Sequence, residues 1–389
     1  ANTCSWCAKA PAVPPACKGA AVAATSVWGR ALGLLGGVLG GLFGTGTAKA
    51  VDLPADRAEG MYHVYQGGGV TATGPALLVR KSLLDKVSLS GSYYVDAVSN
   101  ASIDVVTTAS PFKENRTAYE LGLDYAYRDA LVSLSTSSST EPDYTANAVG
   151  IDVSQEVFGG MTTVALGYTR AVDKVSKKGA PEFKDSAKHW QYRVGVTQIL
   201  SPRLLGSANL EVVSDDGYLG SPYRVARVFG AAVPERNPRT RTSRAIKLRL
   251  IGDLGQRNAA RGEYRYFFDT WDVKAHTAEV GYSRYIGENW LADGFLRVHS
   301  QSAALFYADN ASVETAYLTR NRQLSAFRSL GIGGKLSYLA KKVPGRYEVK
   351  LNGAIERVRF DYSDFTDLRS GGNYRFDANL FQVYVTATF

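Results

Sequence analysis

The chain has 389 residues, a formal net charge of +9 and a mean hydropathy of −0.15. After the amino-terminal region there is no run of about 20 apolar residues, which excludes a protein that crosses a membrane there with helices. The basic residues form no stripe with interleaved aromatic side chains, so the charge gives no indication of nucleic acid as a partner.

The first fifty residues have the features of an export leader. Arg30 is followed by an apolar run, ALGLLGGVLGGLF, and then by a small-x-small site that ends at Ala50. This pattern predicts a signal peptide cleaved after Ala50. The alternative is a retained periplasmic or plug segment, because Gly33, Gly37 and Gly41 repeat at a spacing that lets helices pack closely.

The three cysteines, Cys4, Cys7 and Cys17, all lie in this leader. Cys4 and Cys7 have the spacing of a redox motif. However, no βαβ pattern surrounds them, and Ala8 stands where haem attachment requires histidine. If the segment survives processing, we expect a local disulfide or a weak metal contact. If it is removed, residues 51–389 carry no thiol.

From Met61 onward, apolar and polar residues alternate with the period of two that is typical of β-strands. In residues 117–128, tyrosine and leucine side chains occupy one face while Glu120 and Asp124 occupy the other. Residues 192–197, 245–250 and 346–356 repeat the pattern. Charges on the polar face indicate that this face meets water, whereas the apolar face suits hydrocarbon.

Two kinds of connection alternate between these segments. Seven are mostly tight turns, at residues 83–86, 128–130, 158–161, 201–203, 255–262, 287–289 and 340–345. Eight are mostly longer and polar, at residues 66–71, 100–115, 141–144, 172–187, 215–239, 269–276, 301–324 and 360–374. We therefore predict an all-β fold in which residues 51–389 form a closed antiparallel transmembrane β-barrel of about sixteen strands. Its short turns are periplasmic and its long loops extracellular, as in the bacterial outer membrane.

The last strand ends on the aromatic residue Phe389. Phe381, Val383 and Val385 share its apolar face, and Gln382 lies on the other. Taken alone, this strand also fits the edge of a soluble sandwich; the count and alternation of the connections favour the barrel. Such an end resembles the terminal strand of outer-membrane barrels, which implies that Phe389 is an assembly signal read by the barrel assembly machinery.

Several separated blocks between Met61 and Phe389 resemble one known family. The blocks are LLVRKSLLDKVSLSGSYYVDAVSNASIDVVTTASPF (residues 77–112), TANAVGIDVSQEVFGGMTTVALGYTR (residues 145–170), SDDGYLGSPYRVARVFG (residues 214–230) and the closing strand. They are similar to the bacterial "domain of unknown function 3570" family. The resemblance implies an outer-membrane β-barrel and brings no catalytic residues. Genes of that family are often found beside a small cysteine-containing lipoprotein, a thioredoxin-like protein and a flavin-transferring enzyme, which implies a part in envelope redox chemistry or extracellular electron transfer.

Fifteen ionisable residues of both signs are predicted for the polar face of the strands. They are Glu120, Asp124, Asp152, Arg193, Glu211, Lys247, Arg249, Glu263, Arg265, Asp293, Arg297, Lys335, Glu348, Lys350 and Glu356. One interpretation is a selective constriction, with Lys247, Arg249 and Arg265 forming a basic ladder on neighbouring strands. The other, which we favour, is cross-strand ion pairing that stiffens the wall, because neighbouring strands carry both signs.

The longest predicted loop, residues 214–244, is rich in arginine. Its basic residues are Arg224, Arg227, Arg236, Arg239, Arg241 and Arg244, against three acidic residues. If the loop folds inward as a plug or constriction, its guanidinium groups would attract carboxylates, phosphates or a partner. The favoured alternative is a solvated loop that touches lipopolysaccharide phosphates. Three oxygen-bearing residues in a row at 214–216 are too few for a calcium shell.

We expect no enzyme activity, no cofactor and no metal site. His63, His189, His276 and His299 fall on different predicted strands without metal-ligand spacing. No Gly-x-Ser-x-Gly motif is present, and His299 with Ser300 is the one pair where hydrolytic chemistry could be sought.

Two functions from different classes remain. The first is a pore across the outer membrane with a lumen of mixed charge. The second is a structural shell that holds the small lipoprotein or a redox carrier. In both cases outer-membrane lipid and lipopolysaccharide are the expected surroundings.

Overall fold

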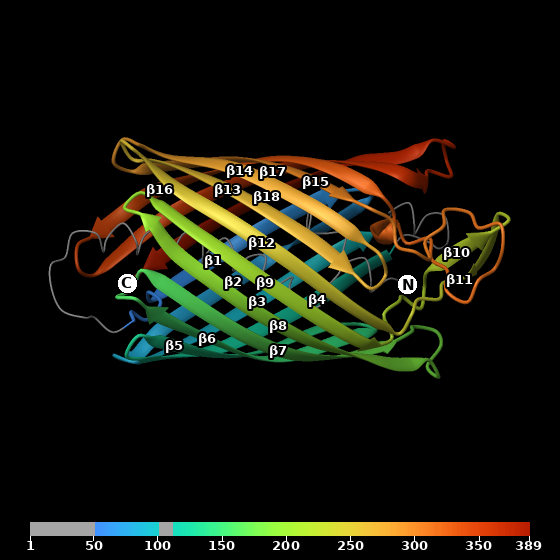
Figure 1. Ribbon diagram of the computed structural model, residues 1–389, viewed down its shortest axis with the longest axis horizontal. Coiled ribbons are helices and arrows are strands. Elements are labelled where there is room, and N and C mark those ends of the chain that lie inside the picture. Colours follow the sequence, from blue (N-terminus) through green and yellow to red (C-terminus); the bar gives the residue numbers. More distant parts are fainter. Residues whose placement is uncertain (1–50, 101–111) are drawn as a thin grey trace.

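The computed structural model describes residues 51–100 and 112–389, and within them sixteen β-strands close into one antiparallel barrel (Figure 1). The barrel strands are β1 (Arg57–Gly67), β2 (Val70–Leu84), β3 (Val87–Asn100), β4 (Phe112–Tyr127), β5 (Ala130–Glu141), β6 (Tyr144–Val157), β7 (Thr162–Ser176), β8 (Lys184–Ser201), β9 (Leu204–Gly217), β12 (Thr240–Gly255), β13 (Asn258–Asp269), β14 (Lys274–Ile286), β15 (Trp290–Gln301), β16 (Phe327–Val343), β17 (Tyr347–Thr366) and β18 (Asn373–Thr388). The predicted fold class and strand number are confirmed. The predictions for residues 1–50 and 101–111 lie outside the described residues.

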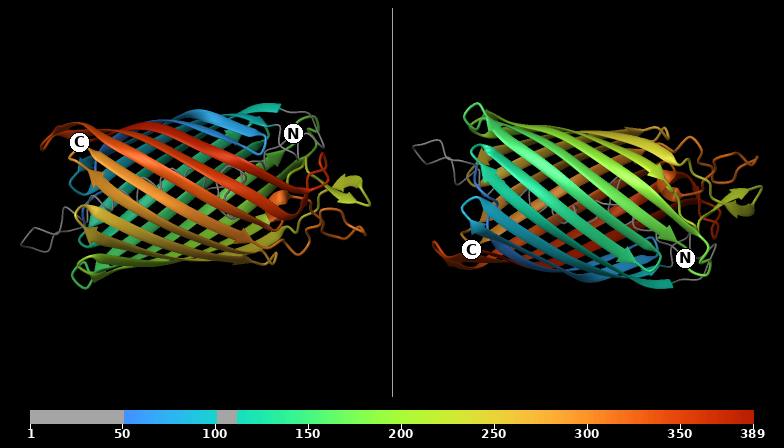
Figure 2. Two further views of the ribbon diagram at one scale, coloured as in Figure 1. Left: turned by 90° about the horizontal axis from the view of Figure 1, so that it is seen from above. Right: turned by 90° about the horizontal axis from the view of Figure 1, so that it is seen from below.

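The first and last strands close the cylinder. β1 pairs with β18 from Arg57 opposite Thr388 to Gly67 opposite Ala378, so both strands leave no open edge. β9 pairs directly with β12, because β10 (Val225–Val228) and β11 (Ala231–Pro234) form a separate hairpin. Figure 2 shows that this hairpin projects beyond the end of the barrel opposite the carboxyl terminus.

The connections at the carboxyl-terminal end are tight. The turn predicted at residues 255–262 is narrower than expected, since β12 ends at Gly255 and β13 begins at Asn258. Gln256 and Arg257 between them both have positive φ, 51° and 64°, as the two central residues of a type I′ turn require. The side-chain amide of Asn258 donates to the Gly255 carbonyl at 3.1 Å and fastens this turn.

The connections at the other end differ widely in length. Those after β1 and β5, predicted as outer loops, are two-residue turns, and the one after β13 has four residues. The longest join β9 to β12 and β15 to β16; the latter contains the 3₁₀-helix η2 (Arg322–Leu324). Only the carboxyl-terminal end thus consists of uniformly short turns, which is the periplasmic pattern.

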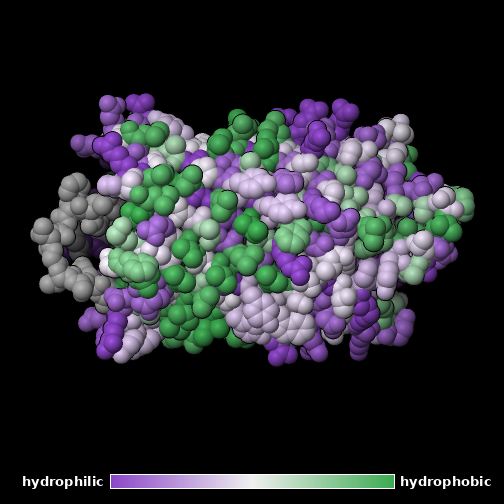
Figure 3. Space-filling model, in the orientation of Figure 1, coloured by the Kyte–Doolittle hydropathy of each residue, from purple (hydrophilic) through white to green (hydrophobic). Residues whose placement is uncertain are grey.

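The outer face of the strands is apolar and exposed. Leu121 is 57% exposed, Ile332 62% and Ile355 61%, and the last strand exposes Phe381, Val383 and Val385 as predicted. Figure 3 shows apolar residues over the side wall of the cylinder, with polar residues denser towards its ends. A closed barrel with this outer face suits hydrocarbon, because all its strand edges are paired. The protein is therefore a β-barrel of the bacterial outer membrane.

Among the described residues, no helix is both long and apolar enough to span a membrane.

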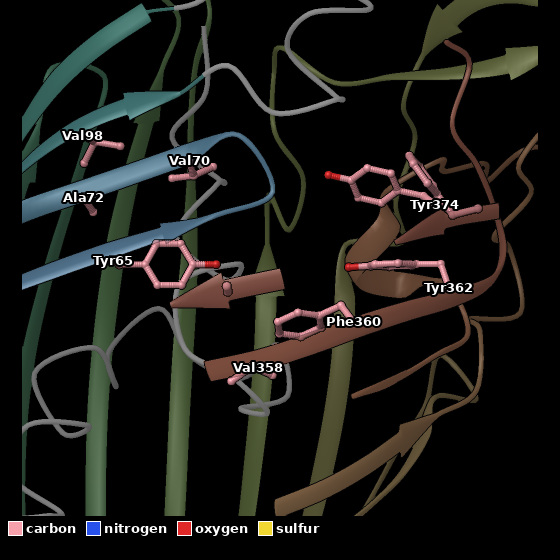
Figure 4. Packing of buried hydrophobic residues seen from close by; sticks show 10 residues of the cluster. Tyr65, Val70, Ala72, Val98, Val358, Phe360, Tyr362 and Tyr374 are labelled. Atoms are coloured by element: carbon pink, nitrogen blue, oxygen red, sulfur yellow. The ribbon is translucent and has the colours of Figure 1, made fainter. Parts of the chain in front are cut away.

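The inner face carries three apolar clusters near the extracellular end, the smallest formed by Tyr144, Ala146 and Val175. The first, drawn in Figure 4, joins residues of β1–β3 such as Tyr65 to Phe360, Tyr362 and Tyr374 of β17 and β18. The second gathers residues around β12–β14, including Phe267 and Trp271. The rest of the inner face is largely polar, and this is where the candidate site lies.

Candidate functional site: the inner wall and the extracellular mouth

The strand register defines which side chains share the inner face. Residues that pair across β12, β13 and β14, such as Lys247 with Arg265 and Glu263 with Glu279, lie on one face, and the exposed apolar residues lie on the other. Followed around the barrel, the register places all fifteen predicted wall residues on the inner face. Among them are the candidate selectivity residues, Arg193, Lys247, Arg249, Glu263, Arg265, Arg297 and Lys350.

A chain of ion pairs runs along the inner face from β13 to β17. Arg261 contacts Asp293 at 2.5 Å and Glu279 at 3.5 Å. Arg297 contacts the same Glu279 at 2.9 Å and Glu356 at 2.8 Å. All five side chains are at most 15% exposed, and each arginine bridges two acids from different strands. We name these five residues the ion-pair chain.

Glycines on neighbouring strands make room for these long side chains. A Cβ added to Gly281 would lie only 2.4 Å from the Cζ of Arg261, so the guanidinium group lies flat over that glycine. Gly331 similarly leaves space where Arg297 reaches across β16 to Glu356. The ion pairs require glycine at these positions, because a side chain there would occupy the space that the arginine side chains fill.

Sequence reasoning missed Arg261 and Glu279. Arg261 was assigned to the predicted turn at residues 255–262, but the narrower turn places it inside β13. Its position two residues before Glu263 was the signal that was available, because alternate residues of a strand share a face.

A second group of ion pairs lies on the inner face of β9, β12 and β13. Lys247 contacts Glu263 at 2.9 Å, and Arg265 contacts Glu211 at 3.6 Å. Arg249 completes the predicted basic ladder; its Nε is buried and has no hydrogen-bond partner within the described part of the chain. Two members of the ladder are thus paired with acids, which favours the ion-pairing interpretation of the wall.

Three more of the predicted wall residues contact a group that favours their charge. Arg193 contacts Asp152 at 2.8 Å, but this pair is more open, at 34% and 44% exposure. Lys350 pairs with Glu348, and the ammonium group of Lys335 lies 5.2 Å from the ring centre of Tyr384. The wall therefore carries paired charges of both signs rather than a strip of one sign.

The arginine-rich segment does not form a single solvated loop. Arg239 donates to both carboxylate oxygens of Asp185, at 2.9 and 2.8 Å, and Arg236 contacts Glu314 at 2.6 Å. Arg241 belongs to β12, where its guanidinium group pairs with Asp269 and is almost fully buried.

Arg224 and Arg227 lie at the β10–β11 hairpin. The Arg227 guanidinium donates to the Gly230 carbonyl at 3.1 Å, and the Arg224 carbonyl accepts from the Glu235 amide at 3.3 Å. The hairpin projects outward (Figure 2), so this part of the loop does not fold inward, whereas Tyr218 and Leu219 of the same connection pack against apolar clusters of the inner wall.

The β15–β16 connection, residues 302–326, packs against the inner wall instead. Arg320 donates to the Thr366 carbonyl at 2.7 Å and lies 4.2 Å from the ring centre of Phe365. Tyr307 donates to the Asp364 carbonyl at 3.0 Å, and its burial raises its pKa. Leu324 belongs to the second apolar cluster, and Tyr307 packs against both the first and the second. This segment therefore connects these two clusters at the extracellular mouth. We call it the mouth loop.

Two of the histidines, His63 and His189, contact aspartates on the inner wall. His189 lies between Asp215, at 2.6 Å, and Asp173, at 3.0 Å. His63 contacts Asp96 at 2.8 Å. The sequence did not reveal these pairs because their partners lie on other strands, β7 and β9 for His189 and β3, two strands from β1, for His63.

The remaining histidine predictions concern chemistry. His299 faces inward and contacts Thr277 at 2.8 Å, whereas Ser300 faces the outer side, so the two cannot form a hydroxyl–imidazole pair. His276 contacts Tyr264 at 2.6 Å on the outer face. Within the described ranges, no group of three or more His, Cys, Asp or Glu residues is arranged to hold a metal ion.

Comparison with known proteins gives a family. A family model described as "Protein of unknown function (DUF3570)" matches residues 44–352. No curated protein matches the chain.

Among solved structures, the siderophore receptor PirA from Pseudomonas aeruginosa is 10% identical, with 88% of this chain and 81% of that chain covered and a TM-score of 0.42. A Pseudomonas aeruginosa FadL homologue is 11% identical, with coverages of 86% and 89% and a TM-score of 0.38. A loop-deleted OmpT, an outer membrane protein of Vibrio cholerae, is 8% identical, with coverages of 86% and 98% and a TM-score of 0.45. Similarity at this level supports no transfer of function.

Proposed function

Because the chain belongs to the DUF3570 family of proteins of unknown function and forms a closed outer-membrane barrel, we propose that it is a pore for small hydrophilic solutes. The observation that supports this proposal most strongly is the combination of sixteen strands with a polar inner face. Barrels of sixteen to eighteen strands are wide enough to leave an aqueous channel, whereas eight strands are filled by their own side chains.

Small hydroxyl side chains support this proposal on one side of the wall. β3 and β5 carry inward-facing serines at alternate positions, namely Ser88, Ser90, Ser92, Ser133, Ser135, Ser137 and Ser139. Serine hydroxyls hydrogen-bond to water and occupy little of the lumen. This sector, opposite in character to the ion-pair chain, is the part of the wall along which a hydrated solute would pass.

The paired wall charges set the expected selectivity. Arg261 and Arg297 are each shared between two acids, so the ion-pair chain has three acids against two arginines. Most of its field is cancelled locally. We therefore propose a pore with weak charge selectivity rather than one dedicated to anions or cations.

A structural shell for a lipoprotein or redox carrier is the second candidate. The mouth loop favours it, because a segment tied to β17 at Tyr307 and Arg320 would narrow the extracellular opening. In that case the barrel would serve as a holder, and the partner would approach from the periplasmic end.

Conductance of the purified protein in planar bilayers tests the two candidates. A pore gives large, steady steps that scale with salt concentration. A silent barrel that co-purifies with a cysteine-bearing lipoprotein refutes the pore and supports the shell. The control is the same preparation after heat unfolding, which must give no steps.

A further inference from the structure

Four arginines project from the outer face of the last three strands at their extracellular ends. They are Arg328 on β16, Arg357 and Arg359 on β17, and Arg375 on β18. They alternate along the strands with the inward-facing Val358, Phe360 and Tyr362, which places them on the lipid side. Four arginines against Asp361 and Asp377 on the same face leave a net charge of +2. We name the four the outer arginine patch.

The register makes the patch compact. Arg328 lies opposite Asp361, which in turn lies opposite Arg375, so these three residues span two strand spacings. That distance is about 10 Å, comparable to the reach of two arginine side chains. Arg359 precedes Asp361 by two residues on the same face, which brings it within about 7 Å along the strand.

Two members of the patch are not neutralised by the protein. Arg357 contacts Asp377 at 2.6 Å, and Arg359 contacts Asp361 at 3.3 Å. Arg328 and Arg375 make no hydrogen bond or ion pair with any residue in the described ranges. Both side chains are exposed, so two guanidinium groups remain available to an anion.

The patch lies directly beside the apolar outer face. Leu330 and Ile332 follow Arg328 on the same face of β16, at 50% and 62% exposure. Ile355 precedes Arg357 on β17, and Phe381 follows the patch on β18. An outward guanidinium at the extracellular border of this surface stands at the level of lipid headgroups in the outer leaflet.

We propose that the outer arginine patch binds the phosphate groups of lipopolysaccharide lipid A, with the acyl chains lying on Leu330, Ile332 and Ile355. Guanidinium groups match phosphate oxygens in bidentate geometry, and such charge-assisted hydrogen bonds are the strong ones at a partly desolvated border. The arginines of the β9–β12 connection serve this purpose less well, because Arg236 and Arg239 are already paired with carboxylates. The inference concerns the outer surface and is independent of the pore.

The test measures binding of diphosphorylated lipid A to the full chain in detergent, by native mass spectrometry and by titration. Arg328→Gln with Arg375→Gln removes both unpaired guanidinium groups. We expect its affinity to fall by about tenfold for each group removed. Arg203→Gln with Arg346→Gln is the matched control, because these exposed arginines lie in turns at the periplasmic end and must leave binding unchanged.

Two further comparisons distinguish the effect of charge from that of bidentate geometry, and binding of lipid A from binding of other phosphate lipids. Arg328→Lys with Arg375→Lys keeps the charge but loses bidentate bonding, so its affinity should lie between those of the wild type and the glutamine variant. Retained heat-modifiable migration shows that each variant is folded. Equal affinity of the wild type and the glutamine variant overturns the proposal. So does equal binding to phosphatidylglycerol vesicles, which carry phosphate without the lipid A arrangement.

Discussion

Replacing Arg297 by alanine is predicted to be one of the most destabilising single changes in the inner wall. The substitution removes two ion pairs at once, to Glu279 at 2.9 Å and to Glu356 at 2.8 Å. Glu279 keeps Arg261 as a partner, but Glu356, at 9% exposure, loses the one cation that it contacts in this chain of pairs. Removing one member of a buried pair costs about 3–5 kcal/mol, because the remaining charge stays desolvated.

A more exposed ion pair on the same wall gives a reference for this loss of unfolding free energy. Arg193 and Asp152 are 34% and 44% exposed, so Arg193→Ala should cost at most about 1 kcal/mol. Arg297→Ala combined with Glu356→Gln should cost less than Arg297→Ala alone, since no uncompensated charge then remains at that position. Urea unfolding in lipid vesicles, followed by tryptophan fluorescence, gives the three free energies. Equal costs for Arg193→Ala and Arg297→Ala would refute the ranking by burial.

Three further predictions concern the wall, the mouth and assembly. Gly281→Val should displace the Arg261 guanidinium and lower the free energy of unfolding by about 1–3 kcal/mol, while Gly262→Ala, whose added Cβ meets nothing within 4 Å, should cost less. Arg320→Ala should release the mouth loop from Thr366 and raise single-channel conductance; unchanged conductance would mean that the loop does not narrow the passage. Deleting Phe389 should reduce the folded fraction in the outer membrane severalfold, measured by heat-modifiable migration, whereas Phe158→Ala at an exposed turn should not.

The strand pattern was predictable because it depends on local alternation. One apolar and one polar face per strand is encoded in residues such as Leu121 and Asp124, and the chain places them on opposite faces of β4 as expected. The width of the turn after Gly255 was not predictable, because Gln256 and Arg257 occupy the left-handed positions that glycine or asparagine usually signal. That error in turn width is why Arg261 was overlooked.

The ion pairs and the mouth loop needed information beyond local pattern. Which acid faces which base depends on register between strands that are far apart in sequence, as in Arg297 and Glu356. The mouth loop has no strand periodicity, so nothing in its sequence showed that Tyr307 and Arg320 pack against β17. The resemblance to a family without known activity implied the same fold and brought no site residues.

A water-filled lumen is tested most directly by thiol accessibility at two adjacent positions of β5, in a chain whose own cysteines are replaced by serine. Ser135→Cys faces the proposed aqueous lumen, and Leu134→Cys, 46% exposed in the structure, faces lipid. If the lumen is filled with water, a charged, water-soluble methanethiosulfonate reagent modifies Ser135→Cys in intact vesicles and lowers its conductance, while Leu134→Cys is unaffected. Rapid modification of Leu134→Cys with an unreactive Ser135→Cys would contradict a water-filled barrel interior.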